Sequence, residues 1–83
     1  MEIKIYSTST CSTCHVLANW LDKQGIKYTK KITDEDPEAM VEFMSVNDGF
    51  LGVPFTIVKD KDGNETKIEG FEPAKFKLAL GIN

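Results

Sequence analysis

The chain carries both of its cysteines in one short stretch, Ser9-Thr10-Cys11-Ser12-Thr13-Cys14. Before this stretch, residues 2–6 alternate apolar and polar side chains, which predicts a strand. After it, apolar residues recur at helical spacing as far as residue 24, and Gly25 is typical of a helix C-terminus. The two cysteines therefore open a helix that follows directly on a strand, with Cys14 on the inward face of that helix.

The spacing of the cysteines predicts a reversible disulfide. With two residues between them, the first helical turn brings the two sulfur atoms within bonding distance. The unpaired amides and the positive potential of a helix N-terminus favour a cysteine thiolate over the thiol, and the thiolate is the attacking species in disulfide exchange. We expect Cys11 to attack a substrate disulfide and Cys14, one turn deeper, to resolve the mixed disulfide that forms.

The rest of the chain predicts an α/β protein built on one mixed sheet. Residues 26–32 alternate as a second strand, which gives a strand-helix-strand unit with parallel strands. Acidic residues and Pro37 start a second helix that runs to about Val46. The later elements are a third strand at residues 54–58, a hairpin turn at Asp62-Gly63, a fourth strand at residues 65–69 and a last helix that opens at Pro73 and ends at Gly81. Helices packed about a single sheet are the economical arrangement of these elements.

Length and charge restrict the kind of protein. The 83 residues suit one domain, residues 1–83. The net charge of -3, with ten lysines and no arginine, gives no reason to expect nucleic acid as a partner. The first residues already form a strand pattern and lack the long apolar stretch of a signal peptide or membrane span, so we expect a cytoplasmic protein without a membrane partner. In that reducing compartment a cycling disulfide is expected and a purely structural one is not.

Three other interpretations of the cysteine pair carry less weight. The two cysteines could be buried core residues that happen to lie close together. A zinc site would need four ligands, and only Cys11, Cys14 and His15 are ligands of the soft kind. The run Cys-x-x-Cys-His also fits haem attachment, which the missing export signal and the strand-to-helix setting oppose. We expect no bound metal, and we expect His15 to be a partly exposed helix residue rather than a catalytic one.

Three landmarks together resemble the glutaredoxin branch of the thioredoxin fold. They are the CxxC pair after the first strand, Val53-Pro54 before the third and Gly70-Phe71 after the fourth. The resemblance covers essentially the whole chain, and it implies a four-stranded mixed sheet flanked by three helices in the order βαβαββα. It also implies that Pro54 is cis and that the backbone of the preceding residue pairs with bound peptide or glutathione like an added strand. The substrate-binding residues so implied are Thr10, Ser12, Thr13, Val53, Pro54, Gly70 and Phe71.

Closer matching favours the NrdH-type redoxins, which are similar to glutaredoxins in sequence but behave like thioredoxins. The matching segments are Gly49-Phe50-Leu51-Gly52-Val53-Pro54, Glu69-Gly70-Phe71-Glu72-Pro73 and the motif Cys-x-x-Cys-His. This resemblance implies a monomeric electron carrier that reduces protein disulfides, with class Ib ribonucleotide reductase as a candidate partner. The chain departs from the subgroup at Leu51 and Glu72, where arginines are expected, and at Ile68, where tryptophan is expected.

The same comparison bears on the source of electrons. Many glutaredoxins have a lysine where this chain has Thr8, and residues 70–73 replace the run that grips the charged end of glutathione. Glutathione would miss those donors and meet the negative Glu72. We therefore expect no tightly bound cofactor and electrons from thioredoxin reductase and NADPH. Two alternatives stay open: a glutathione-dependent glutaredoxin, and a binding module in which Cys11 holds an iron-sulfur cluster between two protomers with glutathione.

Overall fold

The computed structural model describes residues 1–82 of the chain. Its elements are β1 (Glu2–Ser7), α1 (Ser12–Lys23), β2 (Thr29–Ile32), α2 (Pro37–Val46), β3 (Phe55–Lys59), β4 (Glu65–Glu69) and α3 (Pro73–Leu80). This order confirms the predicted βαβαββα arrangement. The predicted single domain over residues 1–83 also takes in Asn83, which lies outside the described residues. No helix within residues 1–82 is both long and apolar enough to cross a membrane.

The four strands form one mixed sheet in the order β2-β1-β3-β4. Strand β1 pairs with β2 in parallel, because α1 carries the chain back across the sheet between them. Strand β3 pairs antiparallel with β1 on one side and with β4 on the other. The hairpin between β3 and β4 turns at residues 60–64, where the Asp60 carboxylate accepts hydrogen bonds from two backbone amides. The predicted mixed sheet is therefore confirmed.

Strand β2 is shorter than its alternating pattern predicts. The pattern begins at Ile26, but pairing with β1 begins only at Thr29, opposite Lys4. The reason is the way α1 ends: Gly25 has a φ of 71°, and the Ile26 amide donates a 3.0 Å hydrogen bond to the Leu21 carbonyl. Ile26 therefore closes the helix C-terminus, and its amide is not available to the sheet.

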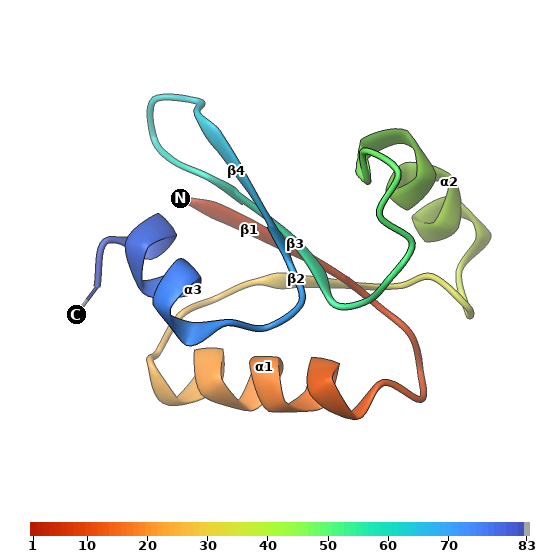
Figure 1. The fold of residues 1–83 in the computed structure, drawn as a ribbon, viewed down its shortest axis with the longest axis horizontal. Helices are drawn as coiled ribbons and strands as arrows, with labels where there is room; N and C mark the ends of the chain where they lie inside the picture. The colour runs from red at the N-terminus through yellow and green to blue at the C-terminus, as the bar shows by residue number, and fades with distance from the viewer. Residues whose placement is uncertain (83) are drawn as a thin grey trace.

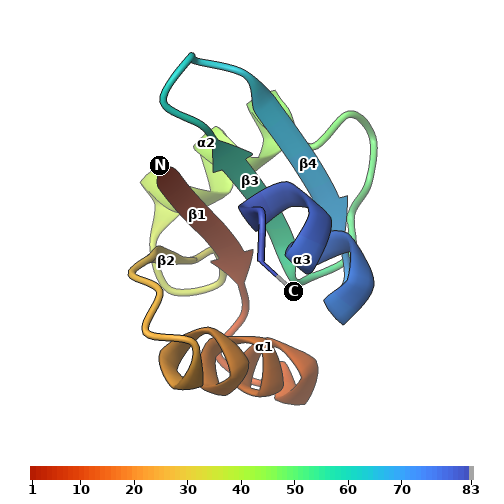
Figure 2. The same cartoon turned by 90° about the vertical axis from the view of Figure 1, so that its left-hand side faces the viewer.

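Each face of the sheet has its own core. Helices α1 and α3 cover one face and α2 covers the other, as Figures 1 and 2 show. The larger core lies under α1 and α3 and consists of Ile3, Ile5, Leu17, Leu21, Val58, Ile68, Phe76 and Leu80. The smaller core lies under α2 and consists of Tyr6, Phe43, Phe55 and Ile57. Since side chains alternate along a strand, β1 supplies Ile3 and Ile5 to one core and Tyr6 to the other.

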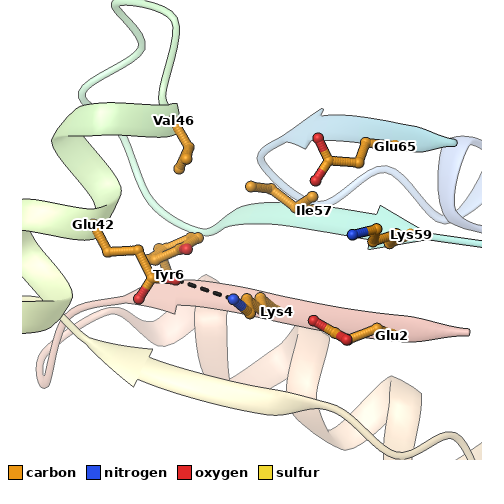
Figure 3. Close-up of a pocket in the computed structure, with 8 residues that line it drawn as sticks. All are labelled: Glu2, Lys4, Tyr6, Glu42, Val46, Ile57, Lys59 and Glu65. Carbon is orange, nitrogen blue, oxygen red and sulfur yellow. Dashed lines mark hydrogen bonds and ion pairs between the residues drawn. The ribbon is translucent and has the colours of Figure 1, made fainter. Parts of the chain in front are cut away.

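A charged cluster joins α2 to the sheet beside the smaller core. The Glu42 carboxylate pairs with Lys4 of β1 at 3.1 Å and with Lys31 of β2 at 3.3 Å. Figure 3 shows the first pair as a dashed line, at the edge of a hollow whose lining also includes Tyr6. The hydrogen bond from Lys4, followed by one from Tyr6, holds the pKa of Glu42 below its usual range. Burial, followed by the Glu42 carboxylate, raises the pKa of Tyr6.

Candidate active site

Cys11 and Cys14 form a disulfide at the start of α1, with their Cα atoms 5.2 Å apart. Cys11 is the N-cap of the helix, and its extended backbone (φ -83°, ψ 106°) turns the chain out of the preceding loop. Its sulfur atom accepts a 3.1 Å hydrogen bond from the Cys14 amide. The Cys11 sulfur thus lies where the unpaired amides of a helix N-terminus stabilise negative charge, which favours a thiolate once the disulfide is opened.

The two cysteines differ sharply in exposure. Cys14 is 1% exposed and lies on the inward face of α1 with Leu17, Ala18 and Leu21. Cys11 is half-buried, and the exposed residues Ser12 and Thr13 follow it in the first helical turn. Only Cys11 can therefore meet a sulfur atom that arrives from solvent. This inequality arises because a helix on a sheet buries one stripe of its surface, and that stripe passes through residue 14.

A second segment reaches the disulfide from the other half of the chain. The peptide bond between Val53 and Pro54 is cis, as the family resemblance implied. Pro54 is buried, and the Val53 carbonyl oxygen lies 3.9 Å from the Cys11 sulfur. Val53 precedes the first paired residue of β3, so it stands at the end of the sheet beside the N-terminus of α1.

The third landmark joins this segment through the backbone. The Gly70 amide donates a 2.9 Å hydrogen bond to the Pro54 carbonyl, which extends the β3–β4 pairing by one step. Gly70 has a φ of 77°, a left-handed conformation that glycine adopts without strain. The ring of Phe71 lies 5.8 Å from Trp20 and 5.7 Å from Phe76, centroid to centroid. The Phe71 side chain is therefore half-buried against the core between α1 and α3.

The loop before the cysteines is held by a contact that the sequence did not reveal. The Asp34 carboxylate accepts hydrogen bonds from the Ser9 amide at 2.9 Å and from the Ser9 hydroxyl at 2.6 Å. The side-chain bond, followed by the backbone bond, holds the pKa of Asp34 below its usual range. From sequence, Asp34 belongs to an acidic run ahead of a helix. Nothing local distinguishes it from its neighbours, because its partner lies 25 residues earlier.

Metal-ligating side chains do not gather around the disulfide. Across the described part of the chain, no three or more His, Cys, Asp or Glu side chains are grouped so as to hold a metal ion. His15 is exposed on α1 and lies outside the buried stripe of the helix. The groups that surround the disulfide are instead backbone amides, the Val53 carbonyl and the hydroxyl-bearing residues Thr10, Ser12 and Thr13, all three exposed.

Comparison with known proteins identifies the family and the fold of the chain. The family model described as glutaredoxin matches residues 3–62. A point mutant of the thioredoxin-like protein BC3987 superposes with a TM-score of 0.82 at 21% identity, covering 99% of this chain and 97% of that one. The glutaredoxin from Methanosarcina mazei Go1 gives 0.80 at 24% identity, covering 98% and 79%.

The NrdH-redoxin from Escherichia coli, whose structure is described as the basis of a thioredoxin-like activity profile, gives a TM-score of 0.73 at 24% identity, covering 100% of this chain and 96% of that one. These structures share the fold. A comparison with curated protein sequences gives no significant match. The family model spans most of the chain and includes the disulfide pair, so this protein belongs to the glutaredoxin family and has the thiol-disulfide oxidoreductase fold of that family.

Proposed function

We propose that this protein is a dithiol electron carrier that reduces protein disulfides, with Cys11 as the attacking residue and Cys14 as the resolving residue. The observation that carries the proposal is the unequal exposure of two bonded cysteines at a helix N-terminus. The half-buried Cys11 can meet a substrate, whereas Cys14, which is 1% exposed, can only react with a bond already formed at its neighbour.

The reaction moves two electrons in two exchanges. The Cys11 thiolate attacks a substrate disulfide R-S-S-R′, forms Cys11-S-S-R and releases R′-S⁻. The Cys14 thiolate then attacks the Cys11 sulfur, forms the internal disulfide and releases R-S⁻. Both released thiolates take protons from solvent. A reductase that draws electrons from NADPH must then return the internal disulfide to two thiols.

The substrate segment would lie against Val53 and Pro54. Val53 stands just outside the paired part of β3, with its carbonyl beside Cys11, so an extended peptide could pair with its backbone as an added strand. Gly70 and Phe71 would border this groove on the β4 side. The exposed residues Thr10, Ser12 and Thr13 would border it on the α1 side.

Thioredoxin reductase is the electron donor in this proposal. Glu72 lies at the start of α3 and is exposed, with its carboxylate 3.6 Å from the Lys75 ammonium. This carboxylate occupies the region that in many glutaredoxins grips the charged end of glutathione. That carboxylate repels the negative charges of glutathione. The proposed location is the cytoplasm, because a cycling disulfide needs a reducing compartment. The proposed oligomeric state is a monomer. Ribonucleotide reductase is the candidate substrate protein.

One assay tests both the reaction and the donor. Insulin disulfides serve as the substrate, and NADPH oxidation is followed with thioredoxin reductase or with glutathione and glutathione reductase. We expect turnover with thioredoxin reductase and at least tenfold less with glutathione. The Cys11→Ser variant serves as control and should be inactive with both. Turnover with glutathione alone would assign the protein to the glutathione-dependent glutaredoxins, and full activity of the Cys11→Ser variant would disprove the mechanism.

A further inference from the structure

Two buried hydroxyl groups have no partner in the disulfide form. Ser7 and Thr56 are both 0% exposed. Among the buried side-chain oxygen and nitrogen atoms of residues 1–82, these two hydroxyl oxygens are the ones that make no hydrogen bond. Buried hydroxyls in folded proteins are nearly always paired, because leaving one unpaired costs its solvation in water. Two such groups in one small protein therefore point to a partner that the oxidised form does not provide.

Ser7 lies on the face of the sheet that α1 covers, at the end of β1 nearer the start of that helix. It shares its face of β1 with Ile3 and Ile5, which belong with Leu21 to the larger core. Figure 1 shows β1 ending at the end of the sheet where α1 begins, and α1 running back along it. Residues 14 and 21 are about 10 Å apart along a helix, and residues 3 and 7 are about 13 Å apart along a strand. Leu21 and Ile3 belong to the same core cluster, so over these lengths α1 carries Cys14 back toward the Ser7 end of β1.

Thr56 lies in the same layer of the core. It is paired with Ile5 in the β1–β3 register, so it is the diagonal neighbour of Ser7 on the same face of the sheet. Val58, two residues further along that face, belongs to the core under α1. Two hydroxyl oxygens on the sheet and the Cys14 sulfur on the inward face of α1 are thus buried toward the same end of this core.

Among the described residues, no charged side chain is fully buried in this part of the core. The buried polar side chains of the described residues are Ser7, Thr33, Asn47 and Thr56, and none of them is ionisable. Thr33 donates its hydroxyl hydrogen to the Ser7 carbonyl, and Asn47 donates its side-chain amide to the Met44 sulfur at the end of α2. On the helix itself, His15 is exposed and Cys11 caps the N-terminus. The hydroxyls of Ser7 and Thr56 are the polar groups left to face Cys14 from the sheet.

We propose that the Ser7 and Thr56 hydroxyls donate hydrogen bonds to the Cys14 thiolate of the reduced protein. A disulfide sulfur is a weak acceptor and leaves them unpaired, whereas a thiolate is a charged and strong one. This inference rests on the proposed role of Cys14 as the resolving nucleophile. In that step the Cys14 proton passes to solvent, the thiolate attacks the Cys11 sulfur of the mixed disulfide, and the released R-S⁻ takes up a proton. The two hydroxyls stabilise the nucleophile of this second exchange.

The first test measures ionisation of Cys14 without any substrate. In the Cys11→Ser background Cys14 is the one remaining thiol, and its thiolate is read from absorbance at 240 nm at fixed pH. We expect Ser7→Ala or Thr56→Val to lower the ratio of thiolate to thiol about tenfold. Thr56→Ser, which removes a methyl group but keeps the hydroxyl, should leave the ratio within twofold. Circular dichroism of each variant checks that the fold is retained.

The second test uses both native cysteines. The equilibrium of each variant with a reduced and oxidised dithiothreitol buffer reports how far the reduced form is favoured. Above the pH at which Cys14 ionises, loss of a donor to the thiolate should shift this equilibrium about tenfold toward the disulfide, or about 30 mV for two electrons. A lower thiolate ratio or a shift toward the disulfide on loss of either hydroxyl supports the proposal, and the opposite change contradicts it. The proposal would be overturned if Ser7→Ala and Thr56→Val had the same thiolate ratio and the same exchange equilibrium as the protein with both native hydroxyls. That result would not affect the insulin assay or the proposed function.

Discussion

At the scale of single residues, Cys11 combines two structural roles. Its sulfur caps α1 by accepting the Cys14 amide, and the same sulfur faces the Val53 carbonyl at 3.9 Å. A thiolate in this position accepts the capping hydrogen bond more strongly than a neutral sulfur does. Opening the disulfide therefore leaves the helix capped, and the nucleophile stays at the place where the substrate segment is proposed to lie.

The division of roles between the cysteines predicts opposite outcomes for two substitutions. Cys14→Ser should leave the first exchange intact and block the second, so a covalent Cys11 adduct with a disulfide substrate should accumulate. Cys11→Ser should form no adduct, because the remaining cysteine, Cys14, is 1% exposed. Mass spectrometry of the protein after incubation with oxidised insulin measures both. An adduct on Cys14 in the Cys11→Ser variant would contradict the assignment.

At the scale of elements, the end of β4 depends on one backbone conformation. Gly70 has a φ of 77°, and a Cβ atom built there would meet nothing within 4 Å. The cost of a side chain at this position is therefore conformational and not steric. The same residue donates to the Pro54 carbonyl, so it couples the start of α3 to the cis-proline segment.

Gly70→Ala should destabilise the protein by about 1–2 kcal/mol, the cost of placing an L residue in the left-handed region. Gly70→Asn is the matched comparison and should lose less, since asparagine tolerates this conformation better. Urea unfolding followed by circular dichroism measures both changes. Equal and negligible losses in the two variants would show that the left-handed conformation is not required here.

The sequence predicted those elements best whose ends are set by local signals. Helix α3 runs from Pro73 to the residue before Gly81, and β4 covers residues 65–69, both as expected. Proline at a helix start and glycine in a left-handed C-cap act within one turn, so they are visible in the sequence. The predicted start of β2 at residue 26 was wrong, because the alternating pattern does not show that the helix C-terminus takes up the Ile26 amide through the Leu21 carbonyl.

At the scale of the whole molecule, α2 is attached to the sheet by a core and by a charge cluster. Tyr6 and Phe43 supply the core, with ring centroids 5.7 Å apart. Glu42 supplies the cluster by pairing with Lys4 and Lys31, and about a third of each of these side chains is exposed. The cluster lies on the sheet face opposite α1, so its loss should affect stability and leave the disulfide chemistry unchanged.

Glu42→Gln should therefore lower the free energy of unfolding by roughly 0.5–1 kcal/mol at pH 7, a value limited by the exposure of the pairs. Because the pKa of Glu42 is lowered in the folded protein, its contribution is present above the pKa of an unfolded glutamate and is lost as the pH falls through the folded value. The difference between the variant and the unmodified protein should shrink toward zero as the pH falls below the usual pKa of a glutamate and then through the lowered pKa of Glu42. Urea unfolding at several pH values measures it, with Glu35→Gln as an exposed control. A difference that stays constant with pH would contradict the ion pairs.

The sequence by itself determined the order of the elements, the position of the cysteine pair at a helix start and the class of reaction, because periodicity, caps and CxxC spacing all act over a few residues. Tertiary structure decided what surrounds that pair. The Val53 carbonyl reaches Cys11 across 42 residues, and Asp34 holds Ser9 across 25. Helical spacing already placed Cys14 on the inward face of its helix, whereas the unpaired hydroxyls of Ser7 and Thr56 depend on how α1 lies on the sheet. Contacts of this kind form between segments that only the packed core brings together, so no local pattern records them.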